Sequence, residues 1–203
     1  MKKVGRQRRR FLLAAASLST GLMSRAVEPA PDRAPIVIDS HTHFYDPTRK
    51  EGVPWPGKDD KLLYRPVLPD ELIKLARPLG VTGTVVVEAS PWVEDNQWVL
   101  DLAARDPFLV GVVGNLGPGE DDFAANLRRF AKDPLFRGIR LRDRPWQGRV
   151  DDARFVDDLR RLADADLELD VNGGPADLPD VARLAERVFW RNVKDVYKWP
   201  DRG

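Results

Sequence analysis

The chain has 203 residues, of which none is cysteine and only two are histidine. The lack of cysteine excludes disulfides and thiolate ligands, so a metal site would need imidazole, carboxylate or carbonyl donors. A long apolar run is also missing, since the run from Phe11 to Met23 has 13 residues and a spanning helix needs about 20. The scarcity of histidine draws attention to one tripeptide, His41-Thr42-His43.

Acidic residues are absent from residues 1–26, which hold seven Lys or Arg. This basic start precedes the apolar run and the small-x-small sequence Ser24-Arg25-Ala26, a pattern typical of an export signal. Arg8 to Leu12 matches the core of a twin-arginine signal, although Gln7 and Leu13 depart from it. We expect a periplasmic or extracellular protein; an ordinary secretory signal and a membrane anchor are the alternatives.

Without residues 1–26 the formal net charge falls from +1 to −6. No basic patch with interleaved aromatic residues remains, which argues against a nucleic-acid partner. No stable membrane span is expected after removal of the signal. The composition therefore indicates neither a nucleic-acid partner nor a membrane span.

After a proline-rich linker at residues 27–35, short β-like runs alternate with amphipathic helical segments. This alternation is typical of an α/β fold with a parallel sheet. The predicted strands are Ile36–Asp39, Thr84–Glu88, Leu109–Val113, Gly138–Leu141 and Leu167–Val171.

The predicted helices each have a recognisable start or an apolar face. One begins at Pro69 and is expected to bury Leu72, Ile73, Leu75 and Ala76; another covers Asn96–Ala104. The remaining three are predicted from Phe123, Leu127 and Phe130, from Phe155, Leu159 and Leu162, and from the stretch that opens at Leu178-Pro179-Asp180.

A long stretch rich in proline and glycine, Tyr45 to Leu68, follows the first strand. A loop of this length in a compact domain is usually functional, and it leaves from the strand end that carries the histidines. We predict a lid; the alternative is an inert surface excursion.

His41 and His43 are two positions apart, so in an extended strand they point to the same face. Two imidazoles in this arrangement can share a divalent cation such as zinc. A catalytic zinc usually has about three protein ligands, so a further donor must come from elsewhere. A strand-end histidine pair without any metal is the alternative.

The chain resembles the amidohydrolase-related branch of the amidohydrolase superfamily, which includes metal-dependent hydrolases and sugar-type lactonases. The stretches that carry the resemblance are Ile38–Phe44, Tyr64–Leu75, Gly80–Ala89, Val110–Leu116 and Pro134–Leu141. The resemblance implies a TIM-type (β/α)8 barrel with its active site at the carboxyl ends of the strands. It also implies hydrolysis of a lactone or related cyclic ester or amide by metal-activated water. A small-molecule substrate is expected from this resemblance.

The resemblance also implies roles for single residues. His41 and His43 match metal ligands, with zinc as the expected ion, although some lactonases of this branch work without metal. Glu88 is a candidate catalytic acid or base, and Arg140, Arg142 and Trp55 are candidates for substrate binding, with ion pairing and packing as the structural alternatives. Trp92 is a weaker pocket candidate, and Asp170 and Asn172 stand where metal-using relatives often have histidine.

Five βα units, at residues 36–188, are fewer than the eight of a closed barrel. We therefore expect a truncated, open barrel followed by an atypical tail at residues 189–203, whose composition fits an out-of-frame sequence. The unpaired sheet edges are expected to promote self-association. An inactive remnant or a weak metal-binding module is the alternative to an active hydrolase; phosphoesterases and related deoxyribonucleases also share the His-x-His pattern.

Overall fold

The computed structural model describes residues 35–197, with side chains up to residue 188. The predicted export signal, nearly all of the linker and the end of the tail lie outside these residues. The elements in chain order are β1 (Ile38–Thr42), α1 (Pro69–Ala76), η1 (Arg77–Leu79), β2 (Gly83–Val87), α2 (Val93–Ala103), β3 (Leu109–Gly114), α3 (Phe123–Phe130), β4 (Phe136–Leu141), α4 (Ala153–Asp164), β5 (Glu168–Val171), η2 (Pro175–Asp177) and α5 (Leu178–Tyr197).

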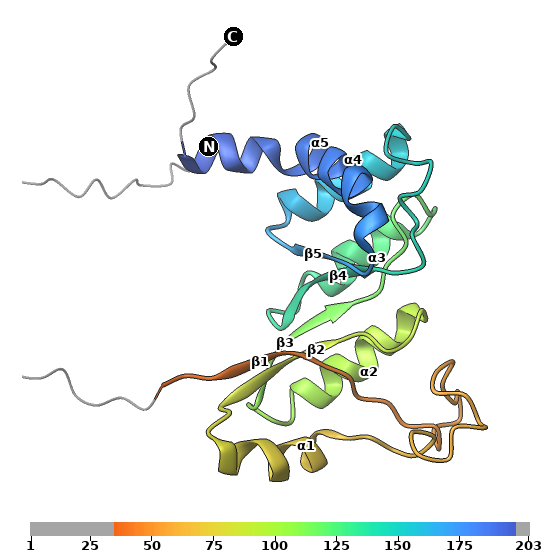
Figure 1. Ribbon diagram of the computed structural model, residues 1–203, viewed down its shortest axis with the longest axis vertical. Helices are drawn as coiled ribbons and strands as arrows, with labels where there is room; N and C mark the ends of the chain where they lie inside the picture. The colour runs from red at the N-terminus through yellow and green to blue at the C-terminus, as the bar shows by residue number, and fades with distance from the viewer. Residues whose placement is uncertain (1–34, 198–203) are drawn as a thin grey trace, which may run out of the picture. The chain divides into compact units, whose positions relative to one another are not determined.

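The five strands form one parallel sheet in the order β1-β2-β3-β4-β5, so each strand lies beside its neighbour in sequence. The sheet curls as half of a barrel (Figure 1). Within the described residues β1 pairs only with β2 and β5 only with β4, so the sheet is open. The predicted α/β class with five βα units of a TIM-type barrel is confirmed.

The core lies between the sheet and its helices. Phe123, Leu127 and Phe130 of α3 are buried, as are Phe155, Leu159 and Leu162 of α4. These residues recur every three or four positions, which places them on one helix face. The central strands β2 and β3 are buried along almost their whole length, as expected of parallel strands covered on both faces.

Three predicted details were wrong. The first strand was predicted at Ile36–Asp39 but spans Ile38–Thr42. Its bounds follow from its pairing with β2, which runs from Ile38 opposite Gly83 to Thr42 opposite Val86. Leu75 of α1 is 66% exposed, since it lies away from the face formed by Leu72, Ile73 and Ala76. Helix α2 begins three residues before the predicted Asn96, at Val93.

In the described part of the chain, no helix has the length and hydropathy needed to cross a membrane.

The β1 edge is unusual for a parallel strand because its apolar side chains are exposed. Ile36, just before β1, is 83% exposed, and Val37 and Ile38 are also exposed. A strand edge with unpaired backbone groups and apolar side chains is a template for pairing with another chain.

We therefore expect the purified chain to self-associate in a concentration-dependent way, measured by sedimentation velocity. The variant Ile36→Lys should weaken association because a charged side chain disfavours edge pairing. Leu62→Lys, at a similarly exposed leucine in the Tyr45–Val67 segment, is the matched control and should change nothing. A chain that stays monomeric at every concentration would contradict this prediction.

Candidate functional site

The histidine pair lies at the carboxyl end of β1. His41 belongs to the strand itself, and His43 follows its last residue, Thr42. The two imidazole rings lie 5.0 Å apart between centroids, at an angle of 80°. The side chains therefore lie on the same side of the strand, as their spacing predicts.

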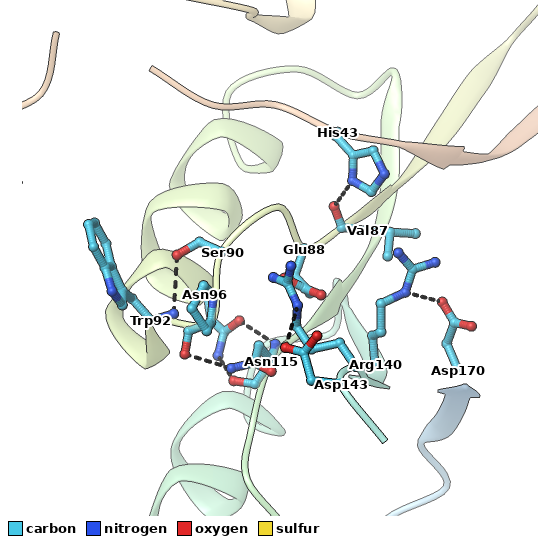
Figure 2. Close-up of polar contacts among 12 residues, drawn as sticks. His43, Val87, Glu88, Ser90, Trp92, Asn96, Asn115, Arg140, Asp143 and Asp170 are labelled. Atoms are coloured by element: carbon cyan, nitrogen blue, oxygen red, sulfur yellow. Dashed lines mark hydrogen bonds and ion pairs between the residues drawn. The ribbon is translucent and has the colours of Figure 1, made fainter. Parts of the chain in front are cut away.

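His43 is oriented by the neighbouring strand. Its Nδ1 lies 2.9 Å from the Val87 carbonyl oxygen at the end of β2 (Figure 2). A carbonyl only accepts hydrogen bonds, so Nδ1 carries the proton and the neutral ring keeps its lone pair on Nε2. Burial lowers the pKa of His43, and the bond to Val87 opposes this effect only in part.

His41 contacts an arginine from the fourth strand. Arg140 Nη2 lies 3.0 Å from His41 Nε2. The same Nη2 lies 3.4 Å from His41 Nδ1, so the guanidinium approaches both ring nitrogens rather than the lone pair of one. Arg140 Nε donates to Asp170 Oδ2 at 2.8 Å (Figure 2). The contacts connect β1, β4 and β5, and the carboxylate of Asp170 holds the guanidinium of Arg140 in place.

Glu88 lies immediately after β2 and is only 7% exposed. Its Oε2 accepts a hydrogen bond of 3.1 Å from Arg142 Nη1. Burial raises the pKa of Glu88 to about 7, although the positive charges of Arg142 and Arg140 act in the opposite direction. Desolvation outweighs these charges because the carboxyl lies deep at the strand end, while Arg142 is partly open to solvent.

Most of these groups line one open cavity of about 180 Å³. Its walls come from the carboxyl ends of four strands and from the segment after β1. The lining residues are His43, Trp55, Glu88, Ala89, Arg140, Arg142 and Asn172. The structure thus brings five of the six predicted site residues to one cavity, and the sixth, His41, contacts Arg140 beside it.

The two tryptophans of the prediction have different surroundings. The Trp55 ring lies 6.4 Å from that of His43 and 5.2 Å from that of Tyr45. Trp92 does not line this cavity, and its backbone N–H donates to Ser90 Oγ at 3.1 Å. Of the two tryptophans, only Trp55 is therefore in position to contact a molecule bound next to His43.

The donors present do not complete a metal site. Among the described residues, no group of three or more His, Cys, Asp or Glu could hold a metal ion. Arg140 Nη2 lies 3.0 Å from His41 Nε2 and 3.4 Å from His41 Nδ1, so a cation bound by this ring would lie beside a guanidinium. His43 Nε2 is the better placed donor.

Two buried polar arrangements were not foreseen from the sequence. Arg49, in the segment after β1, pairs with Asp95 on α2 at 2.5 Å. Asn96 bonds both the backbone N–H and the carbonyl of Asn115, each at 2.8 Å, which ties α2 to the end of β3. The partners are 46 residues apart in the first arrangement and 19 in the second, so no local pattern marks them.

A model of the amidohydrolase family matches residues 38–189, which is more than half of the chain. The chain belongs to the amidohydrolase family. The matched range contains every element of the sheet and all the cavity residues described above.

Two relatives of this amidohydrolase chain are L-fucono-1,5-lactonases. It is 34% identical over 155 residues to the protein of Burkholderia ambifaria, covering 74% of this chain and 52% of the relative. It is 30% identical over 158 residues to the protein of Burkholderia multivorans, covering 74% and 51%. The chain thus spans about half the length of the curated relatives that it matches.

Solved structures agree with the observed fold. An amidohydrolase from Burkholderia multivorans with bound zinc superposes with a TM-score of 0.65 and 27% identity, over 75% of this chain and 54% of the other. Amidohydrolase 2 from Bifidobacterium longum subsp. infantis gives a TM-score of 0.56 and 25% identity, over 75% and 57%. The similarity covers little more than half of each of those chains.

Proposed function

We propose that this chain contributes His41, His43, Glu88, Arg140 and Arg142 to the active site of an exported hydrolase that opens a lactone or a related cyclic ester or amide. One observation carries the proposal. A carboxyl group with a pKa of about 7 and two guanidinium groups converge on one open cavity at the carboxyl ends of the strands. The lactonase relatives support the choice of substrate class.

Glu88 suits the proton transfers of such a reaction. A general base works best when its pKa lies near the working pH, and burial brings Glu88 into that range. The carboxylate takes a proton from water as the water oxygen attacks the ring carbonyl carbon. When the ring C–O bond breaks, the same proton passes to the leaving ring oxygen, so Glu88 is regenerated and a hydroxy acid is released.

The two arginines suit the charge that develops. Arg140 and Arg142 line the same cavity as Glu88, and guanidinium groups stabilise an oxyanion or a carboxylate through charge-assisted hydrogen bonds. Arg140 is held by Asp170, whereas Arg142 is held by Glu88 itself. A substrate that displaces the contact between Arg142 and Glu88 would free both groups for the reaction.

The proposal includes a divalent cation, with zinc as the first candidate. His41 and His43 would supply two donors, and His43 Nε2 is the donor already free of a protein contact. The described residues do not complete the site, so at least one more donor must come from outside them. The guanidinium of Arg140 lies close to both nitrogens of His41, so its positive charge opposes a cation on that ring.

The test combines a panel of sugar-type lactones with zinc titration by calorimetry, using the purified chain and the variants His41→Ala and His43→Ala. We expect hydrolysis of at least one lactone and binding of about one zinc. Loss of a residue that only hydrogen-bonds a metal ligand weakens metal binding roughly 10- to 100-fold. Loss of a ligand itself should have a larger effect, so each variant should weaken zinc binding by more than this.

If neither variant changes hydrolysis or zinc binding, the role proposed for the histidine pair is wrong. If the unaltered chain hydrolyses no lactone but still binds zinc, the chain is a metal-binding module, which is the second candidate.

A further inference from the structure

The segment from Tyr45 to Val67 is closed at its base. Tyr45 and Val67 exchange two backbone hydrogen bonds of 3.0 and 2.9 Å, so the segment leaves β1 and returns before α1 at one point (Figure 1). These bonds fix the base of the segment. Trp55 lies ten residues beyond Tyr45, so these two bonds alone do not fix its position.

Arg49 supplies such a contact with α2. Its guanidinium pairs with Asp95 at 2.5 Å, and the two side chains are only 12% and 15% exposed. The same group lies over the ring of Trp98, with Cζ 4.5 Å from the ring centroid. A partly desolvated ion pair combined with a cation–π contact favours one orientation, whereas an exposed pair is easily exchanged for water.

The space beneath the segment is almost filled. A cavity of about 20 Å³ remains between it and α2, which is room for about one water molecule. Arg49, Trp55 and Asp95 all line this space. The segment therefore packs on α2 rather than standing over a hollow. Arg49 and Trp55 line the same small space, so a change at Arg49 can reach Trp55 across it.

Trp55 belongs to both cavities. It lines the small apolar space beneath the segment and the polar cavity that contains His43, Glu88 and the two arginines. Glu88 and Ala89, which follow β2, also line both, so these three residues separate the two cavities. A shift of the Trp55 ring would change the shape of the polar cavity next to His43.

We propose that Arg49 is a positioning residue: its contacts with Asp95 and Trp98 hold Trp55 as a wall of the polar cavity and thereby set how tightly a small substrate binds. The effect on substrate binding rests on the proposed function, whereas the effect on Trp55 does not. Arg49 lines the small space and not the polar cavity, and Trp55 is the residue of its own segment that lines both.

The first readout is the indole N–H signal of Trp55 in a ¹H–¹⁵N spectrum of the full chain, assigned with Trp55→Phe. Arg49→Met removes the charge and keeps much of the side-chain length. We expect the Trp55 signal to move toward that of a solvent-exposed tryptophan in Arg49→Met and in Asp95→Asn. Arg49→Lys keeps the charge opposite Asp95 and should restore part of the original shift.

The matched control is Arg65→Met. Arg65 lies in the same segment and pairs with Glu71, but both side chains are about half exposed. Loss of this pair should leave the Trp55 signal unchanged. Far-UV circular dichroism identifies any variant that does not fold. If Arg49→Met does not fold, the Trp55 signal of Asp95→Asn, which removes the same ion pair, tests the proposal instead.

The second readout is lactone hydrolysis. Because Trp55 shapes the cavity and takes no part in proton transfer, Arg49→Met should raise KM about 10-fold and change kcat by less than about 2-fold. An unchanged Trp55 signal in both folded variants, or an equal shift in Arg65→Met, would overturn the proposal. If the unaltered chain hydrolyses no lactone, the proposed function fails, while the Trp55 signal still decides the role of Arg49.

Discussion

Replacing Glu88 by glutamine is expected to lower kcat/KM for lactone hydrolysis by about 10²- to 10⁴-fold, the usual contribution of a positioned general base. Glutamine has nearly the same shape and can still accept a hydrogen bond from Arg142, but it cannot take a proton at neutral pH. The measurement is steady-state hydrolysis of the best lactone of the panel.

The pH dependence offers a second test of Glu88. A general base must be deprotonated, and burial raises the pKa of Glu88 to about 7. For the unaltered chain, kcat/KM should therefore increase with pH up to about 7 and then level off. The residual activity of Glu88→Gln should lack this ascending limb.

The matched control for Glu88 is Glu94→Gln. Glu94 also pairs with an arginine, Arg129 at 2.7 Å, but its side chain is 74% exposed and lies on α2 away from the cavity. This variant should keep kcat/KM within about 2-fold, as expected of a surface ion pair. A Glu88→Gln variant that also stays within that range would show that Glu88 is not the base.

Replacing Gly138 by alanine is expected to destabilise the chain by about 1 to 3 kcal/mol or more, the usual cost of overpacking. Gly138 on β4 lies opposite Glu168 on β5, and a Cβ at this position would overlap the Glu168 carbonyl oxygen. The clash is with backbone, so no rotation of a side chain can relieve it. Strands β4 and β5 would have to move apart.

Urea denaturation followed by far-UV circular dichroism measures this loss. Gly57→Ala is the control, because nothing lies within 4 Å of a Cβ built there and its φ is not positive. Its free energy of unfolding should change by less than about 0.5 kcal/mol, as for most surface substitutions. Equal stability of the two variants would mean that β4 and β5 do not approach as closely as described.

The Gly138→Ala variant also affects the site. Arg140 follows two residues later on β4, and its partner Asp170 lies on β5. Separation of the two strands would lengthen this ion pair of 2.8 Å and release Arg140 from His41. We therefore expect a loss of substrate binding that accompanies the loss of stability.

Much of the fold could be predicted because its signals are local. The apolar faces of α3 and α4 recur at helical spacing, and the buried strands β2 and β3 are short runs rich in Val. The errors at β1 and α1 arose where tertiary contacts decide. The register of β1 depends on β2, and the exposure of Leu75 depends on which helix face meets the sheet.

The site was predictable only as a set of residue types near strand ends. His41, His43, Glu88, Arg140 and Arg142 end or follow strands, and the ends of parallel strands meet at one edge of a sheet. Their pairing could not be predicted. The Arg140 guanidinium could have faced solvent or any nearby carboxylate, and only the adjacency of β4 and β5 selects Asp170.

The sequence by itself determined the α/β class, the order of the five βα units and the same-face placement of His41 and His43. These properties follow from periodicities of two and about 3.6 residues, which need no knowledge of distant contacts. The tertiary structure alone decided that Arg140 meets His41 across 99 residues of chain, that Glu88 is buried against Arg142, and that Arg49 holds the segment beside α2. Burial raises the pKa of Glu88 and lowers that of His43, and this burial exists only once the strands lie side by side.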